Sequence, residues 1–191
     1  WFMFDDEIVC LGAGITNKGM DLPVETAVEN KKLGEDGGSR LTIDGTVMDL
    51  PVSEGELKDI VNGTADVTGT PVDHVTWAHL EGNESAGTGY YFPYENTELN
   101  VRRARTTGNW KDVGTSEGES TQNYMEMWFD HGVNPEDASY GYVLLPGKTA
   151  DETADYAQSP KAVILMNNPY AQAVHHEELG ITGINFWEDQ E

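Results

Sequence analysis

Three arginines lie close together in a chain whose charge is otherwise strongly negative. Arg102, Arg103 and Arg105 belong to 11 basic residues, which face 34 acidic ones and leave a formal net charge of −23. Arginine holds carboxylate or sulfate groups through paired hydrogen bonds, so this cluster can bind an anionic ligand. On a strand, Arg103 and Arg105 would share one face. Neutralisation of neighbouring acidic side chains within the fold is the alternative interpretation.

A second cluster, Asp5-Asp6-Glu7, lies inside the apolar run that spans residues 2–11. On a strand, Asp5 and Glu7 would share one face and Asp6 would point to the other. Because burying unpaired carboxylates is costly, the triplet must lie at an edge, pair with cations or bind a hard metal such as Ca²⁺. The residues alone favour the solvated or salt-bridged edge over the metal.

Other reactive side chains give weaker signals. The five histidines lack the spacing of a metal-binding motif, so surface or packing roles are favoured. Cys10 is the single cysteine, which excludes an internal disulfide and indicates a buried, inert thiol. Aromatic residues are frequent in the second half of the chain, where alternate positions fill a core and one or two can instead stack on a sugar ring.

Composition limits the class of protein. The acidic residues are scattered along the chain and would repel phosphate, which disfavours nucleic acid and anionic membranes as partners. No run of about 18 apolar residues occurs, so the sequence predicts no membrane-spanning helix. With 38% hydrophobic residues, the chain is expected to fold around a core.

The pattern of elements is almost wholly β. Short apolar or alternating runs recur between turn residues, as in an antiparallel sandwich or barrel. Asp44-Gly45 predicts a two-residue hairpin, and Thr149-x-x-Glu152 predicts a capped helix that ends before Pro160. Residues 53–62 suggest a short helix and residues 115–123 a loop. The predicted strands span residues 2–11, 24–32, 40–43, 46–48, 74–80, 89–92, 98–104, 124–130, 140–145, 162–167, 171–175 and 180–186.

Several segments together resemble one family. WFMFDDEIVCLGAGI at residues 1–15 resembles the signature strand of the central sandwich in family 8 polysaccharide lyases, which include hyaluronate, chondroitin AC and xanthan lyases. ETAVENKK at residues 25–32 is similar to the strand that follows. The resemblance continues in order through HVTWAHLEG, GYYFP, RTTGNW, MWFDHGVNPEDASYGYVLLPG and QAVHHEELGITGINFW.

The resemblance implies an all-β fold over residues 1–191: one antiparallel super-sandwich of the galactose-mutarotase-like kind, with one or two short helices. In the family this domain packs against an α-helical toroid, and uronate-containing polysaccharide is cleaved by β-elimination in the cleft between them. The proton-transferring residues belong to the toroid, which is expected upstream of residue 1 together with the first strands. The resemblance therefore assigns no catalytic residue to this chain, and the isolated piece is expected to be inactive.

The resemblance also implies sites and partners. A calcium site would use Asp5, Asp6, Glu7 and, as the fourth ligand, Glu177. Arg105 is the favoured substrate-binding residue, with Arg103 and Arg102 in the same region. The expected partners are an acidic polysaccharide (glycosaminoglycan or xanthan-like) and the toroid of the same full-length chain, in a secreted, extracellular protein. Alternatives are a non-catalytic carbohydrate-binding or cell-surface sandwich module and a salt-dependent structural sandwich.

Overall fold

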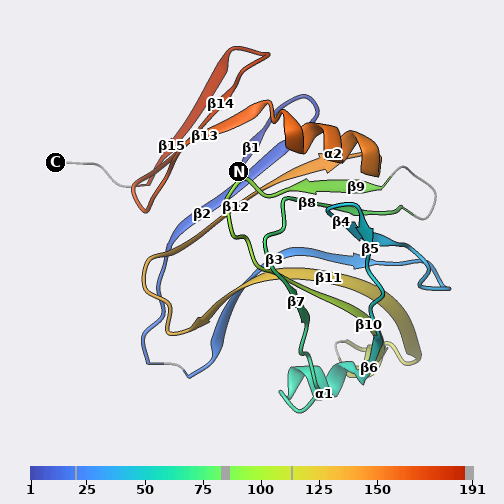
Figure 1. Ribbon diagram of the computed structural model, residues 1–191. Coiled ribbons are helices and arrows are strands. Elements are labelled where there is room, and N and C mark those ends of the chain that lie inside the picture. Colours follow the sequence, from blue (N-terminus) through green and yellow to red (C-terminus); the bar gives the residue numbers. More distant parts are fainter. Residues whose placement is uncertain (20, 83–86, 113, 188–191) are drawn as a thin grey trace.

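The computed structural model describes residues 1–19, 21–82, 87–112 and 114–187. Over these residues the strands form three sheets, and all but one of their pairings are antiparallel, the exception being the parallel pair β6–β10. Figure 1 shows the two larger sheets stacked on each other, with the third sheet to one side. The all-β antiparallel sandwich predicted from the sequence is confirmed.

The larger sheets have the orders β1-β2-β12-β9-β8-β4-β5 and β3-β11-β10-β6, with β7 pairing β10. The strands of the first are β1 (Phe2–Met3), β2 (Ile8–Ile15), β4 (Leu41–Ile43), β5 (Thr46–Val47), β8 (Trp77–Leu80), β9 (Thr88–Tyr91) and β12 (Ala138–Pro146). Those of the second are β3 (Pro23–Lys32), β6 (Val52–Glu56), β7 (Thr70–Val72), β10 (Leu99–Asn109) and β11 (Glu119–Val133). The third sheet contains β13 (Ala162–Asn167), β14 (Ala171–His176) and β15 (Ile181–Phe186). The helices are α1 (Leu57–Val61), the 3₁₀ turn η1 (Trp110–Asp112) and α2 (Ala150–Gln158).

The main core lies between the two larger sheets. Along β11, Met125, Met127 and Phe129 are buried, because alternate side chains of a strand point to the same face. They pack in one cluster with residues of the opposite sheet, among them Leu41, Leu80 and Tyr90. The Tyr90 hydroxyl is fully buried and donates a 2.5 Å hydrogen bond to Oε2 of Glu29 on β3, which links the two sheets. Burial, and then the Glu29 charge, raise the pKa of Tyr90 far above its usual range.

A second cluster covers the other face of β2 and β12. Val9, Val143 and Leu145 are buried there beneath α2 and the third sheet, together with Tyr156 and Val174. Helix α2 begins as predicted, because Thr149 and Glu152 form a complete capping box. It packs closely on β9, where a Cβ atom added to Gly89 would lie 2.2 Å from Oγ1 of Thr153.

The other local predictions have mixed outcomes. Asp44 and Gly45 have φ angles of 45° and 82°, so the predicted hairpin between β4 and β5 is confirmed. Residues 53–62 contain the predicted short helix, but β6 occupies the first part of that segment. The prediction of a loop over residues 115–123 is wrong for residues 119–123, because β11 begins at Glu119, which pairs with Asn109 of β10. No helix of the described residues is long and apolar enough to cross a membrane.

Candidate functional site

The outer face of the β10–β11 pair carries polar side chains. The register aligns Arg102 with Glu126, Thr106 with Gln122 and Gly108 with Ser120. Their odd-numbered neighbours, such as Val101 and Met125, point into the main core. Because strand side chains alternate, one hydrophobic face forces the even-numbered residues onto a single exposed surface.

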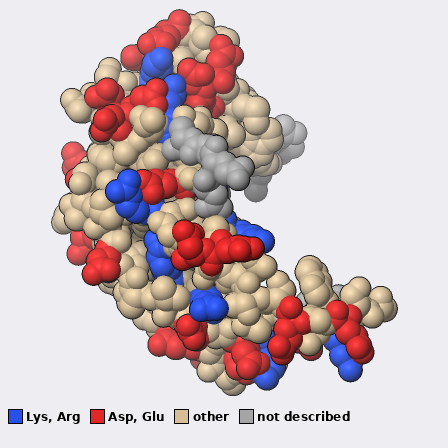
Figure 2. Space-filling view, turned by 90° about the vertical axis from the view of Figure 1, so that its right-hand side faces the viewer, with Lys and Arg blue, Asp and Glu red and all other residues tan. Residues whose placement is uncertain are grey.

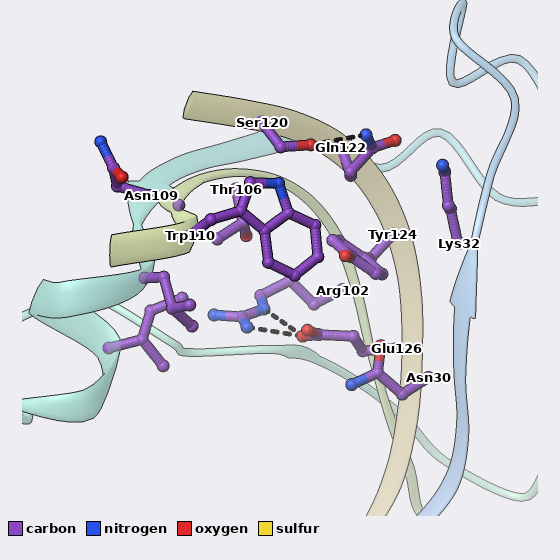
Figure 3. A pocket seen from close by; sticks show the side chains of 13 residues that line it. Asn30, Lys32, Arg102, Thr106, Asn109, Trp110, Ser120, Gln122, Tyr124 and Glu126 are labelled. Carbon is purple, nitrogen blue, oxygen red and sulfur yellow. Dashed lines mark hydrogen bonds and ion pairs between the residues drawn. The ribbon is translucent and has the colours of Figure 1, made fainter. Parts of the chain in front are cut away.

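This surface forms the floor of a cavity of about 530 Å³, here called the outer cavity. Leu57 and Ile60 of α1 form one wall, and Asn30 and Lys32 of β3 form another. Figure 3 shows the Trp110 indole in the middle of the view, between Thr106 and Tyr124. The remaining lining residues are Arg102, Gly108, Asn109, Ser120, Gln122 and Glu126. An aromatic residue among amides and hydroxyls offers both a flat apolar surface and hydrogen-bond partners.

Arg102 and Glu126 form an ion pair across the floor of the outer cavity (Figure 3). Nε and Nη2 of Arg102 lie 2.7 Å and 2.5 Å from Oε2 of Glu126, and the side chains are 9% and 21% exposed. Nη1 also donates to the carbonyl of Asp66 at 3.4 Å. With most of its donors occupied and little of its surface accessible, Arg102 holds the floor together.

Trp110 lies where β10 ends and η1 begins. Its backbone N–H donates to the carbonyl of Gly118, which fixes the start of the turn. The residue is 57% exposed although it lines the cavity, so part of the ring is accessible to a ligand. Gly108, two residues before it, faces α1, and a Cβ atom added there would lie 3.3 Å from Leu57. The glycine therefore permits the close approach of α1 that forms the wall.

A second cavity of about 310 Å³, here called the rim cavity, adjoins the outer cavity and shares Lys32 and Gln122 with it. Its other lining residues are Glu35, Arg105, Thr121 and Asn123. Arg105 is 55% exposed, and its Nη1 lies 3.9 Å from Oε1 of Glu54, a loose contact. Exposed ion pairs of this kind are weak, so the guanidinium can exchange Glu54 for another anion.

The structure separates the three arginines. Arg102 lines the outer cavity and Arg105 the rim cavity, whereas Arg103 donates to the carbonyls of Gly37 and Ser39. Burial lowers the pKa of Arg103. Arg103 therefore ties the loop after β3 to the sheet and lines neither cavity. A substrate-binding role for Arg103, as for the other two, stays a prediction.

Trp110 and Tyr124 belong to the aromatic residues of which one or two were expected to stack on a sugar ring, but the sequence did not indicate which ones, and it gave no sign of Gln122. The available signal was the alternation along β11, where Ser120, Gln122, Tyr124 and Glu126 occupy successive even positions. That pattern marks one polar face, but α1 and η1 had to be placed in space before the face could be recognised as a cavity.

The acidic triplet lies in the bend between β1 and β2, not on a strand, which corrects the expectation that Asp5 and Glu7 share a strand face. Asp5 and Asp6 are exposed, and Nζ of Lys148 lies 3.8 Å from Oδ2 of Asp6. Glu7 is buried, with its Oε1 2.9 Å from Nε2 of His176. Desolvation raises the pKa of Glu7 above its usual value, and the opposing charge of His176 offsets only part of this rise.

These surroundings do not fit a calcium ion as they stand. Oε1 of Glu7 faces the imidazole of His176, and the positive charge of Lys161 also lowers the pKa of Glu7. Glu177, the expected fourth ligand, is exposed at the turn after β14, where its backbone N–H donates to the carbonyl of Lys161. Within the described residues, no group of three or more His, Cys, Asp or Glu side chains is arranged to hold a metal. Calcium binding stays a prediction of the resemblance.

Comparison with known proteins identifies the family of this chain. The family model described as "Polysaccharide lyase family 8, super-sandwich domain" matches residues 1–157. The chain belongs to polysaccharide lyase family 8. The model of the C-terminal beta-sandwich domain of family 8 matches residues 163–191, which contain nearly all of the third sheet. The expectation that residues 1–191 form one domain stays a prediction.

Individual members of family 8 are similar over nearly the whole chain. A xanthan lyase of Bacillus sp. (strain GL1) is 41% identical over 195 residues, covering 99% of this chain and 19% of that protein. A hyaluronate lyase of Thermasporomyces composti is 36% identical, covering 98% and 22%. The solved Paenibacillus xanthan lyase has a TM-score of 0.86 and 38% identity, covering 100% of this chain and 17% of that chain. The chain thus spans about a fifth of the length of these family 8 relatives.

Proposed function

We propose that this chain is the β-sandwich part of a polysaccharide lyase that cleaves uronate-containing polysaccharide by β-elimination. Here it serves as scaffold and as one wall of the substrate cleft. The support is membership of family 8, whose similar members are named xanthan lyase, hyaluronate lyase and chondroitinase AC. An α-helical toroid of the same full-length protein would form the opposite wall and carry the proton transfer.

The outer cavity is the observation that carries the proposal. It combines an exposed tryptophan, the amides of Asn30 and Gln122, and a polar floor that the Arg102–Glu126 pair keeps rigid. Sugar rings present apolar C–H faces and peripheral hydroxyl groups, which match an aromatic ring surrounded by amides. Arg105 and Lys32 at the rim would meet the acidic groups of the polymer.

The negative net charge of the chain does not exclude an acidic polysaccharide from every part of its surface. The net charge is −23, but Figure 2 shows Lys and Arg side chains interleaved with Asp and Glu over the face in view. Because exposed charges are screened within about 8 Å at physiological ionic strength, local cations outweigh distant carboxylates for a bound anion. The negative surface would keep a secreted protein soluble, which supports the proposal of an extracellular location.

Binding to the chain itself tests the proposal. Isothermal titration with hyaluronate, chondroitin and xanthan oligosaccharides should give saturable binding to at least one, and none to neutral dextran. Gln122→Ala, in the cavity, should weaken that binding, whereas Gln158→Ala at the exposed end of α2 should not. Absence of binding to every acidic oligosaccharide would refute the proposed role of the cavity.

Activity separates the lyase from a non-catalytic carbohydrate-binding module. The ultraviolet absorbance of an unsaturated uronate product should not rise when the chain alone is mixed with the polysaccharide that binds. It should rise with a lyase that contains these residues together with a helical toroid. Binding without any such activity in the larger protein would favour the non-catalytic module.

A further inference from the structure

The lining of the outer cavity changes in character along β10. Its charged members, Lys32, Arg102 and Glu126, lie toward one end, where Arg102 and Glu126 are cross-strand partners. Toward the other end, around Thr106 and Gly108, the described lining residues are all uncharged. Arg102 and Thr106 are four residues apart on the strand, which corresponds to about 13 Å. The two ends can therefore contact different parts of an extended ligand.

The uncharged end has an aliphatic wall, formed by Leu57 and Ile60 of α1. Strand β6 runs parallel to β10 and aligns Gly55 with Thr106, so α1 begins beside this end of the cavity. Residues three apart lie on the same side of a helix, which turns both aliphatic side chains toward the cavity. None of the five residues of α1, all of which the structure describes, is buried. These two side chains therefore line the cavity without belonging to a core.

We infer that this aliphatic wall contacts the methyl group of an acetyl substituent, so that Leu57 and Ile60 make the outer cavity selective for acetylated sugars. The inference rests on the proposed function, and it adds a substituent that the cavity recognises. The ligand class is an oligosaccharide in which an uncharged sugar carries an acetamido or an O-acetyl group.

An acetyl group fits this end of the cavity because it joins a methyl group to a carbonyl oxygen. The methyl group gains from an apolar neighbour, since contact with the wall removes apolar surface from water. The carbonyl oxygen needs a donor, and Thr106 and Gln122 are cross-strand partners on the adjoining floor. Nε2 of Gln122 donates to Oγ of Ser120 at 2.9 Å, which orients the amide. A bare hydroxyl group could bind the polar floor, but it would leave the wall without an apolar partner.

Trp110 lies at the same end of the cavity, two residues beyond Gly108. A Cβ atom added to Gly108 would lie 3.3 Å from Leu57, so the wall stands close to this part of β10. A sugar ring placed on the exposed indole therefore brings its substituents within reach of the wall. In this arrangement the indole contacts the ring, and the wall contacts the acetyl group of the same sugar.

The test compares ligands that differ by one methyl group and not in charge. A hyaluronate oligosaccharide is prepared with N-acetyl groups and, after deacetylation and formylation, with N-formyl groups. Isothermal titration should show that the chain binds the N-acetyl form about fourfold more tightly, which is the effect of burying one methyl group. A xanthan oligosaccharide with and without its O-acetyl groups forms a second comparison, which distinguishes an acetyl group on oxygen from one on nitrogen.

Substitutions in α1 assign the preference to the wall. Ile60→Ala should reduce the preference for the N-acetyl form to about twofold or less, and Ile60→Val should give an intermediate value. Val61→Ala is the matched control, because Val61 is the next residue of α1, is 76% exposed and lies outside the cavity lining. It should leave the preference unchanged. Thermal unfolding shows whether each variant is folded, and Ile60→Val decides if Ile60→Ala is not.

The outcomes separate this inference from the proposed function. If the wild type binds no acidic oligosaccharide, the proposed function fails and the inference fails with it. If the wild type binds but shows no preference in either comparison, or if the Ile60 variants keep the full preference, the wall does not select acetyl groups and the proposed function stands. A preference in one comparison alone that Ile60→Ala reduces supports the inference and identifies the linkage.

Discussion

The Arg102–Glu126 pair allows the floor of the outer cavity to be tested as a structural element. Arg102→Met removes the guanidinium and leaves a Glu126 carboxylate that is 21% exposed without its partner. Breaking a fully buried pair costs about 3–5 kcal/mol, because one charge is left uncompensated. Since water still reaches part of Glu126, we expect a loss of about 2–3 kcal/mol in the free energy of unfolding. For a chain of this size that corresponds to about 4–12 °C in the melting temperature.

Urea denaturation followed by circular dichroism measures this loss. Glu126→Leu alone leaves a buried guanidinium unpaired and should also destabilise the chain. The double variant Arg102→Met/Glu126→Leu should recover to within about 1 kcal/mol of the wild type, because no charge is left unpaired. Arg105→Met is the matched control, since the same side-chain change at an exposed position should alter stability by about 0.5 kcal/mol or less. Equal midpoints for Arg102→Met and the wild type, or additive losses in the double variant, would refute the structural role assigned to Arg102.

Three further substitutions test individual side-chain environments in the fold. Tyr90→Phe removes the buried donor to Glu29 and should cost about 1.5–3 kcal/mol in urea denaturation; an unchanged midpoint would show that this bond contributes nothing. Gly89→Ala places a methyl group 2.2 Å from Oγ1 of Thr153 and should lower the free energy of unfolding by about 1–3 kcal/mol, because α2 must move away. Gly45→Ala is the comparison: no atom lies within 4 Å of the added methyl group, so this variant measures only the strain of a positive φ angle. Partial desolvation, followed by the Asp130 charge, raises the pKa of Glu25, although the residue is exposed. Because solvent screens most of this effect, Glu25→Gln should stabilise the chain only slightly at pH 7, and the gain should vanish below about pH 4, where the unfolded carboxyl is also protonated. A gain that persists at that pH would contradict the cause given for the shift.

Calorimetric titration tests calcium binding at the acidic triplet. Calorimetry with Ca²⁺ should give saturable heat that Asp6→Ala weakens if the triplet binds the ion as the family resemblance implies. A flat trace would agree with the arrangement seen here, in which Glu7 faces His176 and Asp6 lies near Lys148.

The sequence by itself determined the elements that depend only on residues close together in the chain. The Asp44-Gly45 turn follows from two residues that tolerate positive φ, and α2 from a capping box read over four residues. Alternation of apolar residues predicted an all-β sandwich, because one face of each sheet must be buried. The ordered series of family-like segments indicated the family that the comparisons then showed.

Tertiary structure decided which of the chemically suggestive residues act together. The sequence grouped Arg102, Arg103 and Arg105 by proximity, but their alternation on β10 and their different neighbours gave each a separate environment. It also placed Asp5 and Glu7 on one strand face, whereas the chain bends there and buries Glu7 against His176, 169 residues later by their numbers. The outer cavity depends on α1, β3, η1 and β11 meeting in space, and such long-range packing leaves no periodic signal in the segments that contribute to it.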